Sequence, residues 1–374
     1  MTRLLVVATG LGVGGTERHL LAVLPRLRAH GFAPRIACLR SGGALAPDFA
    51  AAGIEVTELG DGGGLPGAVR AVPRLRAWLS RERPAIAHFF LPEAYLLGGL
   101  ATLGLGGLVR VMSRRSLNRY QRHHPLAARV EGWLHRRMDA VLANSAAVAA
   151  ELRAEGAPPD RLHVIANGLV FAAGGDRAAT RAALGLAPDT LAIVVVANLI
   201  AYKGHADLLA ALAAARARLP GSWVLLCVGR DDGIGADLAA RAEAAGLAAQ
   251  VRFLGQRDDV PDLLAASDIA VSASHEEGSS NAVLEAMAAG LGVVATDAGG
   301  NAEAIRPGID GLLVPPRDPA ALGAALVALA GDAGLRARLG DAARARAARD
   351  FSLTACVDRY AALYRGLLAR KATP

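Results

Sequence analysis

Lysine is scarce in this sequence. Of its 41 basic residues only Lys203 and Lys371 are lysines, so arginine carries nearly all of the positive charge. Arginine binds anions as a planar fork and lysine as a compact point charge, so the two are not interchangeable. Lys203 lies between a predicted strand and a predicted helix. We expect it to meet a ligand diphosphate at the mouth of a cleft; a solvated side chain is the alternative.

Cysteine is also rare, and its spacing excludes two classes of site. Cys38, Cys227 and Cys356 lie far apart, without a CxxC pair, so the sequence predicts neither a disulfide framework nor a cysteine metal site. The acidic pairs Asp231-Asp232 and Asp258-Asp259 form no Asp-x-Asp triplet and are typical of a turn and a helix start. We therefore expect neither a metal nor a cofactor.

Long apolar runs are missing as well. The longest stretch without a charge covers 94–109, 16 residues that include five glycines, whereas a membrane span needs about 20 apolar residues. The first ten residues are too short for a secretion signal and are typical of a buried strand. We expect no transmembrane helix and a cytoplasmic protein that is peripheral to the inner face of the cell membrane.

Strand-like and helix-like segments alternate along all 374 residues. This rhythm is interrupted once, by a turn-rich and glycine-rich stretch at 167–176, and then restarts. Such alternation predicts βαβ units and parallel sheets, here two Rossmann-like doubly wound α/β domains facing a central cleft. We expect an N-terminal domain at 1–170, a C-terminal domain at 171–350, and a final helix at 351–374 that packs back on the first domain.

A glycine-rich turn follows the first predicted strand. The segment Gly10–Glu17 fits the GxGxxG spacing and precedes a predicted helix, where backbone N–H groups bind phosphate. A dinucleotide enzyme needs an acidic residue after the second strand, whereas this sequence places Arg40 there. Because Arg40 suits a 2′-phosphate, an NADP-dependent oxidoreductase stays open, beside another phosphate contact or a purely structural turn.

Two glutamates eight residues apart mark the most informative segment. Glu277 and Glu285 are separated by up to about 12 Å along a helix, too far to share one metal or one proton. That spacing suits the two ends of an elongated ligand, and the amides of 278–281 at the helix start suit phosphate. The alternative is a pair of surface glutamates on an amphipathic helix.

Six motifs in sequence order resemble those of the family 4 retaining glycosyltransferases of GT-B fold. They lie between residues 5 and 365: Gly14–Glu17, Asn144-Ser145, Asn167-Gly168, Lys203-Gly204, the Glu277–Glu285 segment and Gly299–Glu303. The resemblance implies a metal-independent enzyme with a UDP- or GDP-linked sugar donor. It also implies front-face displacement, in which the leaving phosphate helps to take the acceptor proton.

The resemblance assigns roles to the matching residues. Glu277 would meet the donor sugar, Glu285 the ribose hydroxyls, and Lys203 the leaving diphosphate. His88 joins Glu277 and Lys203 as an expected catalytic residue, with a structural histidine as the alternative. Where the family usually has an arginine this chain has Asn198, so another cation must supply that charge. The expected donor-binding residues are Gly14, Gly15, Asn198, Lys203, Arg257, Glu277, Gly278, Ser279, Ser280, Asn281 and Glu285.

Positive charge is concentrated in the first half of the chain. Residues 1–170 hold 21 arginines against 12 acidic residues, and eight of those arginines lie at 110–137 beside one acid, Glu131. Interleaved apolar side chains suit an anionic membrane or a lipid-linked acceptor, and a solvated basic face is the alternative. Nucleic acid is disfavoured because no recognition module accompanies the charge. The expected acceptor or membrane residues are Arg114, Arg115, Arg119 and Arg122.

The resemblance and the charge pattern together imply a retaining glycosyltransferase. It would move a sugar from a nucleotide sugar, bound by the C-terminal domain at 171–350, to an acceptor bound by the N-terminal domain at 1–170, a lipid-linked glycan in surface polysaccharide assembly. The NADP-dependent oxidoreductase leaves Lys203 and the two glutamates without a role. A non-catalytic protein that binds sugar nucleotides in the same cleft is the second alternative. It predicts donor binding without turnover, whereas the enzyme predicts slow donor hydrolysis without acceptor.

Overall fold

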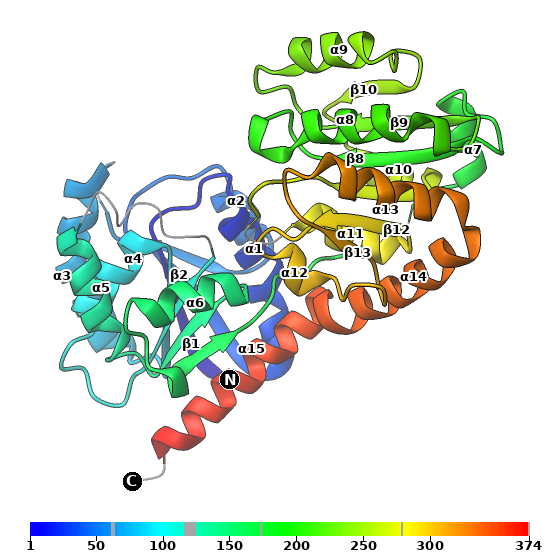
Figure 1. Cartoon of the computed structure of the whole chain (residues 1–374). Coiled ribbons are helices and arrows are strands. Elements are labelled where there is room, and N and C mark those ends of the chain that lie inside the picture. Colours follow the sequence, from blue (N-terminus) through cyan, green and yellow to red (C-terminus); the bar gives the residue numbers. More distant parts are fainter. Residues whose placement is uncertain (61–63, 116–124, 173, 278–279, 373–374) are drawn as a thin grey trace. The chain divides into compact units, whose positions relative to one another are not determined.

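A computed structural model describes residues 1–60, 64–115, 125–172, 174–277 and 280–372 (Figure 1). Contacts divide the chain into two units, one formed by Met1–Gly168 with Leu353–Pro374 and the other by Leu169–Ser352. Each unit is built on one parallel sheet covered by helices, so the two doubly wound sheets that the sequence predicts are confirmed.

The first unit contains a seven-stranded sheet of order β3-β2-β1-β4-β5-β6-β7. All neighbouring strands are parallel, and the order reverses between β1 and β4. Its strands are β1 (Thr2–Ala8), β2 (Phe32–Cys38), β3 (Glu55–Glu58), β4 (Ile86–Phe90), β5 (Val109–Arg114), β6 (Ala140–Ala143) and β7 (Leu162–Val164). Its helices are α1 (Gly15–Leu27), α2 (Ala46–Ala51), α3 (Gly64–Glu82), α4 (Pro92–Ala101), α5 (Pro125–His135), α6 (Ala146–Ala154) and α15 (Leu353–Ala372).

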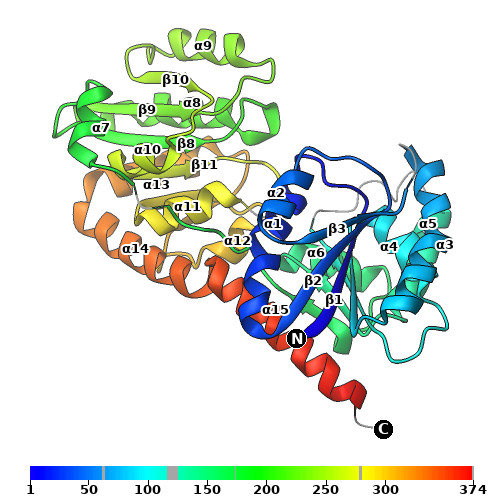
Figure 2. The ribbon, with the colours of Figure 1, turned by 180° about the vertical axis from the view of Figure 1, so that it is seen from behind.

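Strand β1 shows how the first unit builds a core on both faces of its sheet. Because successive side chains of a strand point to opposite faces, Leu4 and Val6 enter one buried cluster and Leu5 and Val7 another. The first cluster includes side chains of α15, which packs against α1. Figure 2 shows α15 beside α1 from behind. The last helix is thus part of the core of the first unit.

The second unit contains a six-stranded sheet of order β10-β9-β8-β11-β12-β13, which reverses between β8 and β11. Its strands are β8 (Leu191–Val196), β9 (Trp223–Val228), β10 (Val251–Gly255), β11 (Ile269–Ser272), β12 (Gly292–Thr296) and β13 (Leu312–Val314). Its helices are α7 (Arg177–Ala183), α8 (His205–Ala215), α9 (Gly235–Ala244), α10 (Val260–Ala266), α11 (Asn281–Ala289), α12 (Asn301–Ala304), α13 (Pro319–Gly331) and α14 (Ala333–Arg346).

Among the described residues, no single helix is both long enough and apolar enough to cross a membrane. One bent pair, Pro319–Gly331 with Ala333–Phe351, meets the criteria of length and composition only when its two parts are taken together.

Candidate functional site

A polar cavity of about 220 Å³ opens in the second unit where the strand order reverses. In doubly wound sheets, ligands bind beyond the carboxyl ends of the strands at this point. The wall is formed by the ends of β8 and β11 and by the start of α11. Charged and polar side chains reach it from these elements and the adjoining loops: Lys203, Ser272, Ser274, Glu277, Ser280 and Asn281.

Lys203 and Glu277 meet in this cavity. The Lys203 Nζ donates to Glu277 Oε1 at 2.5 Å, and the Ser274 hydroxyl donates to the same oxygen at 2.8 Å. Both charged side chains are mostly buried, with 20% and 10% of their surface exposed. Ser274 was not among the predicted site residues, although it follows the carboxyl end of β11. The arrangement holds a cation and a carboxylate ready for exchange with a ligand.

Two glycines fix the backbone around the ion pair. Gly204 has φ +70°, and a Cβ there would lie 1.9 Å from the carbonyl oxygen of Ala273. Gly299 has φ +52°, and its Cβ would lie 1.7 Å from the carbonyl oxygen of Glu277. Gly300 N donates to that same oxygen at 3.2 Å. The loops after β8 and β12 therefore press against the segment that carries Glu277.

Helix α11 begins at the cavity. Ser280 is its N-cap, and the Ser280 hydroxyl accepts a hydrogen bond from Val283 N at 3.4 Å. The free N–H groups and the dipole of a helix start favour an anion here. Gly278 and Ser279, both predicted to bind the donor, lie outside the described residues.

Glu285 lines a different and larger cavity of about 410 Å³ in the same unit. Its other walls come from α10, from the end of α11, and from residues 170–172 and 174, including Phe171 and Pro261. Burial raises the pKa of the Glu285 carboxyl above its usual value. Helix α11 contributes to the walls of both cavities. Glu277, which precedes this helix, lines the first cavity, and Glu285, which lies within it, lines the second.

Asn198 and Arg257 are each occupied by neighbouring side chains or backbone. The Asn198 amide accepts from Arg230 N at 3.2 Å and donates to Asp232 at 3.3 Å. Arg230, 62% exposed, donates to Asp232 at 2.6 Å. Arg257 makes a matching fork with Asp259, at 2.7 and 2.6 Å, and lines neither cavity. Asn198 thus fastens the loop that presents Arg230.

The glycine-rich turn of the first unit leaves space at the start of α1. At Gly15 a Cβ would meet nothing within 4 Å, and its φ needs no glycine. Gly14 is the N-cap, and a Cβ there would meet only the side chain of Glu17. Arg40 donates through Nε to Glu93 at 2.9 Å and pairs with it through a second nitrogen. The guanidinium expected to read a 2′-phosphate already has a carboxylate.

The expected role of His88 as a catalytic contact is wrong for this structure. His88 lies in the middle of β4 and is fully buried. Its Nδ1 is 2.7 Å from the Tyr364 hydroxyl, and its Nε2 is 2.7 Å from the Ser113 hydroxyl. Burial, assisted by the charge of Arg115, holds the pKa of His88 well below its usual value. His88 is a neutral structural residue that joins β4, β5 and α15.

Arg114 also departs from expectation. Its guanidinium is buried and donates to Glu131 at 2.8 Å and to Glu155 at 2.6 Å, so it presents no charge to a membrane or an acceptor. Arg115 is half-buried and donates to Asn167 Oδ1 at 2.6 Å. Arg119 and Arg122 lie outside the described residues.

A buried histidine next to the cavity predicts acid sensitivity. His205 begins α8 and is 3% exposed; among the described residues neither ring nitrogen has a partner. Burial, with a smaller contribution from Lys203, lowers the pKa of His205 to about 4. The unfolded chain, at about 6.5, then binds more protons, so this stability is complete above pH 6.5 and is lost as the pH falls.

We expect about 2 kcal/mol of the second unit's stability to disappear between pH 6.5 and pH 5. His205→Leu removes the titrating group without stranding a hydrogen-bond partner, so its melting temperature should fall less over the same range. Scanning calorimetry of both proteins at several pH values measures this. Parallel losses in the two proteins would contradict the assignment to His205.

Comparison with known proteins identifies the chain. A model described as Glycosyltransferase Family 4 matches residues 13–172, and one described as Glycosyl transferases group 1 matches residues 190–332. The chain belongs to the group 1, family 4 glycosyltransferases. Family members with similar sequences include two proteins named D-inositol 3-phosphate glycosyltransferase. That of Rhodococcus jostii is 35% identical over 237 residues, and that of Streptomyces bingchenggensis 34% identical over 244.

These matches cover 61% of this chain and 52% and 54% of the two relatives, so the chain spans about half the length of the curated relatives it matches. The fold is that of GT-B glycosyltransferases. Anabaena HepE in complex with UDP superposes with a TM-score of 0.84 at 23% identity, over 98% of this chain and all of that one. A glycosyltransferase of Rickettsia africae gives 0.80 at 21% identity, over 98% and 99%.

Proposed function

We propose that this chain moves a sugar from a UDP- or GDP-linked donor to an acceptor, with retention of configuration and without a metal. The observation that carries the proposal is the Lys203–Glu277 pair at the start of α11, in the cavity at the reversal point of the second sheet. The family membership supports it. So does the fold it shares with HepE, whose structures hold UDP and UDP-glucose.

Donor binding then works by exchange of partners. The diphosphate takes the Lys203 ammonium and the free N–H groups of α11, while the sugar hydroxyls donate to the Glu277 carboxylate that Lys203 releases. A positive charge and a helix dipole fixed beside the leaving group stabilise the negative charge that develops as the glycosidic bond breaks. Glu285 accepts hydrogen bonds from the ribose in the neighbouring cavity. The cation that replaces the family's arginine at Asn198 would be Arg230, which must exchange its fork with Asp232 for the diphosphate.

The open space at Gly15 fits the same scheme. Neither packing nor backbone torsion requires a glycine at position 15, so the missing side chain leaves room for a ligand to approach the backbone closely. Helix α1 begins there, and the N–H groups of its first turn have no partner within the helix. The start of α1 is therefore open to an anionic group. Family membership disfavours the oxidoreductase alternative, and the Arg40 guanidinium that it would use is paired with Glu93.

Nucleotide binding tests the function directly. A ligand at 100 times its Kd adds about 2.7 kcal/mol of stability, so thermal unfolding is to be measured with UDP, GDP, ADP, CMP and NADP in turn. We expect a shift of several degrees with UDP or GDP alone, followed by slow hydrolysis of the matching nucleotide sugar. A shift with NADP alone overturns the proposal, and binding without any hydrolysis favours the non-catalytic alternative.

We further propose that the acceptor is a lipid-linked glycan at an anionic membrane, as in surface polysaccharide assembly. Helix α5 supports this with an exposed stripe of Leu126, Val130 and Trp133, which are 74%, 36% and 38% exposed. Exposed Arg129 lies on the same helix, and the Arg137 guanidinium lies 3.5 Å from the centre of the Trp133 ring. Apolar and cationic side chains on one exposed face suit the interface of a bilayer.

Vesicle binding checks this surface. The other two tryptophans, Trp78 and Trp223, are buried, so a blue shift of the emission on adding anionic vesicles reports Trp133. We expect this shift with anionic and not with zwitterionic vesicles. Leu126→Ser should weaken vesicle binding by about 10-fold or more. The control is Ile309→Ser, which alters an exposed side chain of the second unit. Equal binding by both variants would exclude α5.

A further inference from the structure

Two adjacent arginines at the end of β5 differ in their charge partners. Arg114 points into the first unit and is paired with two carboxylates, Glu131 and Glu155. Arg115 points to the other side and, among the residues that the structure describes, no carboxylate lies within ion-pair distance of it. The nine residues that follow it, 116–124, contain no Asp or Glu. Within the described part of the chain, Arg115 is thus a partly desolvated cation without a carboxylate partner.

The groups that surround Arg115 are neutral. Its guanidinium donates to Asn167 Oδ1 at 2.6 Å and bonds the Tyr360 hydroxyl, and the Cys356 thiol lies nearby. His19, from α1, and His88, from β4, are further titratable neighbours among the described residues. Burial raises the pKa of Cys356 to about 11 and that of Tyr360 to about 12, so neither supplies a negative charge near neutral pH.

A half-buried guanidinium loses much of its hydration, and neutral hydrogen-bond acceptors offset only part of the free-energy cost of that desolvation. A charged partner offsets more of the cost, and a guanidinium binds two oxygens of a phosphate or carboxylate at once. The chain supplies such partners to Arg114 and none, within its described part, to Arg115. The missing counter-charge points to a ligand.

The position of Arg115 is that of a ligand site. Arg115, Asn144 and Asn167 leave the carboxyl ends of three neighbouring parallel strands, β5, β6 and β7. Ligands of doubly wound sheets bind beyond this edge. Asn144 Nδ2 donates to the carbonyl oxygen of Arg115 at 3.0 Å and so fixes the backbone that carries the guanidinium. The Asn144 Oδ1 is buried without a partner among the described residues.

We propose that Arg115 binds an oxyanion carried by the acceptor, a phosphate or carboxylate group. This inference rests on the proposed function. The donor residues proposed above, Lys203, Glu277 and Glu285, belong to the second unit, so we assign the oxyanion at Arg115 to the acceptor. Asn144 and Asn167 hold the guanidinium in place and do not neutralise it. The acceptor class is therefore a glycan, polyol or lipid carrier that bears an anionic group.

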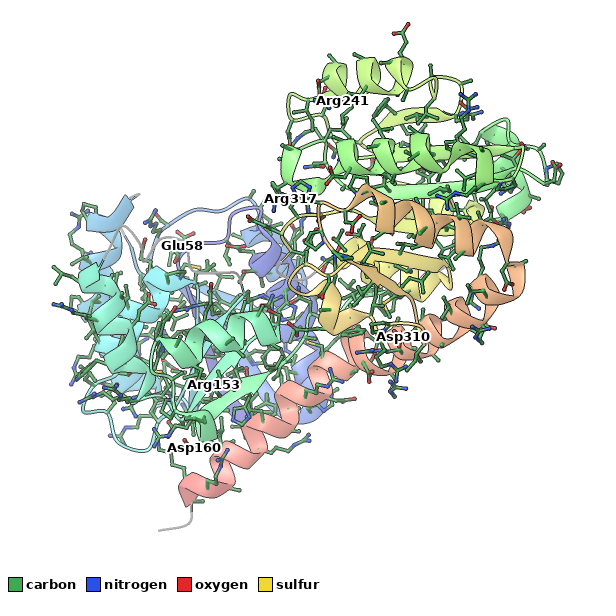
Figure 3. The ribbon with its side chains drawn as sticks, viewed as in Figure 1. Glu58, Arg153, Asp160, Arg241, Asp310 and Arg317 are labelled. Atoms are coloured by element: carbon green, nitrogen blue, oxygen red, sulfur yellow. The ribbon has the colours of Figure 1, made fainter. Side chains whose placement is uncertain are left out.

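Inorganic phosphate is the probe for the site. Its affinity is to be measured by calorimetric titration of the wild type, Arg115→Gln, Arg115→Lys and Lys203→Gln, the last to remove the expected phosphate site of the donor. The matched control is Arg153→Gln, an exposed arginine on α6 of the same unit (Figure 3). We expect Arg115→Gln to bind phosphate about 10-fold or more weakly and Arg115→Lys to regain part of the loss. Binding by Arg115→Gln equal to that of the control overturns the site.

A second measurement uses the wild type alone and does not depend on how a variant folds. The charge of Arg115 lowers the pKa of both His19 and His88. An anion bound to Arg115 offsets that charge, so saturating phosphate should raise both pKa values, as followed by NMR of the imidazole rings. Unchanged values at saturation overturn the proposal.

Nucleotide binding by the Arg115→Gln variant separates this inference from the proposed function. Arg115→Gln should bind UDP or GDP as the wild type does. A loss of nucleotide affinity as large as the loss of phosphate affinity would assign the oxyanion to the donor and overturn the acceptor assignment. Failure of every nucleotide to bind would instead overturn the proposed function, while the phosphate result at Arg115 would stand.

Discussion

Replacing Glu277 by alanine should abolish sugar transfer while leaving the nucleotide bound. The carboxylate accepts from Lys203 and Ser274 without ligand and, as proposed, from the sugar hydroxyls in the reaction. Loss of a preorganised contact of this kind costs about 10²- to 10³-fold in turnover. Free UDP carries no sugar and therefore does not use the proposed contact with Glu277. Its affinity should be unchanged or higher, because Lys203 loses the carboxylate that competes with the diphosphate.

Two matched variants sharpen the test. Glu277→Gln keeps the hydrogen-bonding shape without the charge and should retain a small part of the activity. Glu285→Ala alters the neighbouring cavity and should weaken UDP binding by about 10-fold or more, because hydrogen bonds to a charged group are worth about 1.5–3 kcal/mol. Calorimetric titration with UDP and initial rates with the nucleotide sugar measure both effects. Equal loss of UDP affinity in Glu277→Ala and Glu285→Ala would refute this division of roles.

The alternation of segments was enough to predict both sheets, because parallel strands buried on both faces are nearly continuous apolar runs. The sequence placed the Lys203 segment and the Glu277 segment each after a strand but did not predict the strand order, and the structure shows that these strands, β8 and β11, lie side by side. The sequence pattern could not show which side chains are in contact. The 2.5 Å contact between the two charges depends on Gly204 and Gly299, whose clashes appear only once the loops are folded.

His88 and Arg114 show where sequence reasoning fails. A histidine in an apolar segment resembles a site residue until its partner is known. Here that partner, Tyr364, comes from a helix 276 positions away in the chain. Arg114 ends β5 and Arg115 follows it, and only the folded unit shows that Glu131 and Glu155 lie within reach of Arg114. Charge counts locate basic segments and do not show which charges are already paired.

Gly299→Ala should inactivate the protein without touching any group that meets a substrate. At φ +52° an alanine is strained, and its Cβ would lie 1.7 Å from the carbonyl oxygen of Glu277, so the Glu277 backbone must move. The carboxylate then leaves its place beside Lys203 and Ser274. We expect turnover to fall by about 10²-fold, since a misplacement of about 1 Å costs that much. Stability should also fall by about 2–3 kcal/mol or more.

Gly308→Ala is the control, because it separates backbone strain from displacement of Glu277. Gly308 has φ +74°, but a Cβ there would meet nothing within 4 Å. In this variant the free energy of unfolding should fall only by the strain of an alanine in the left-handed region, about 1–2 kcal/mol. Its turnover should be unchanged. Thermal unfolding and initial rates of both variants decide the matter. Similar activity in the two would mean that contact with the Gly299 loop does not position Glu277, and that the catalytic geometry depends on Lys203 and Ser274 alone.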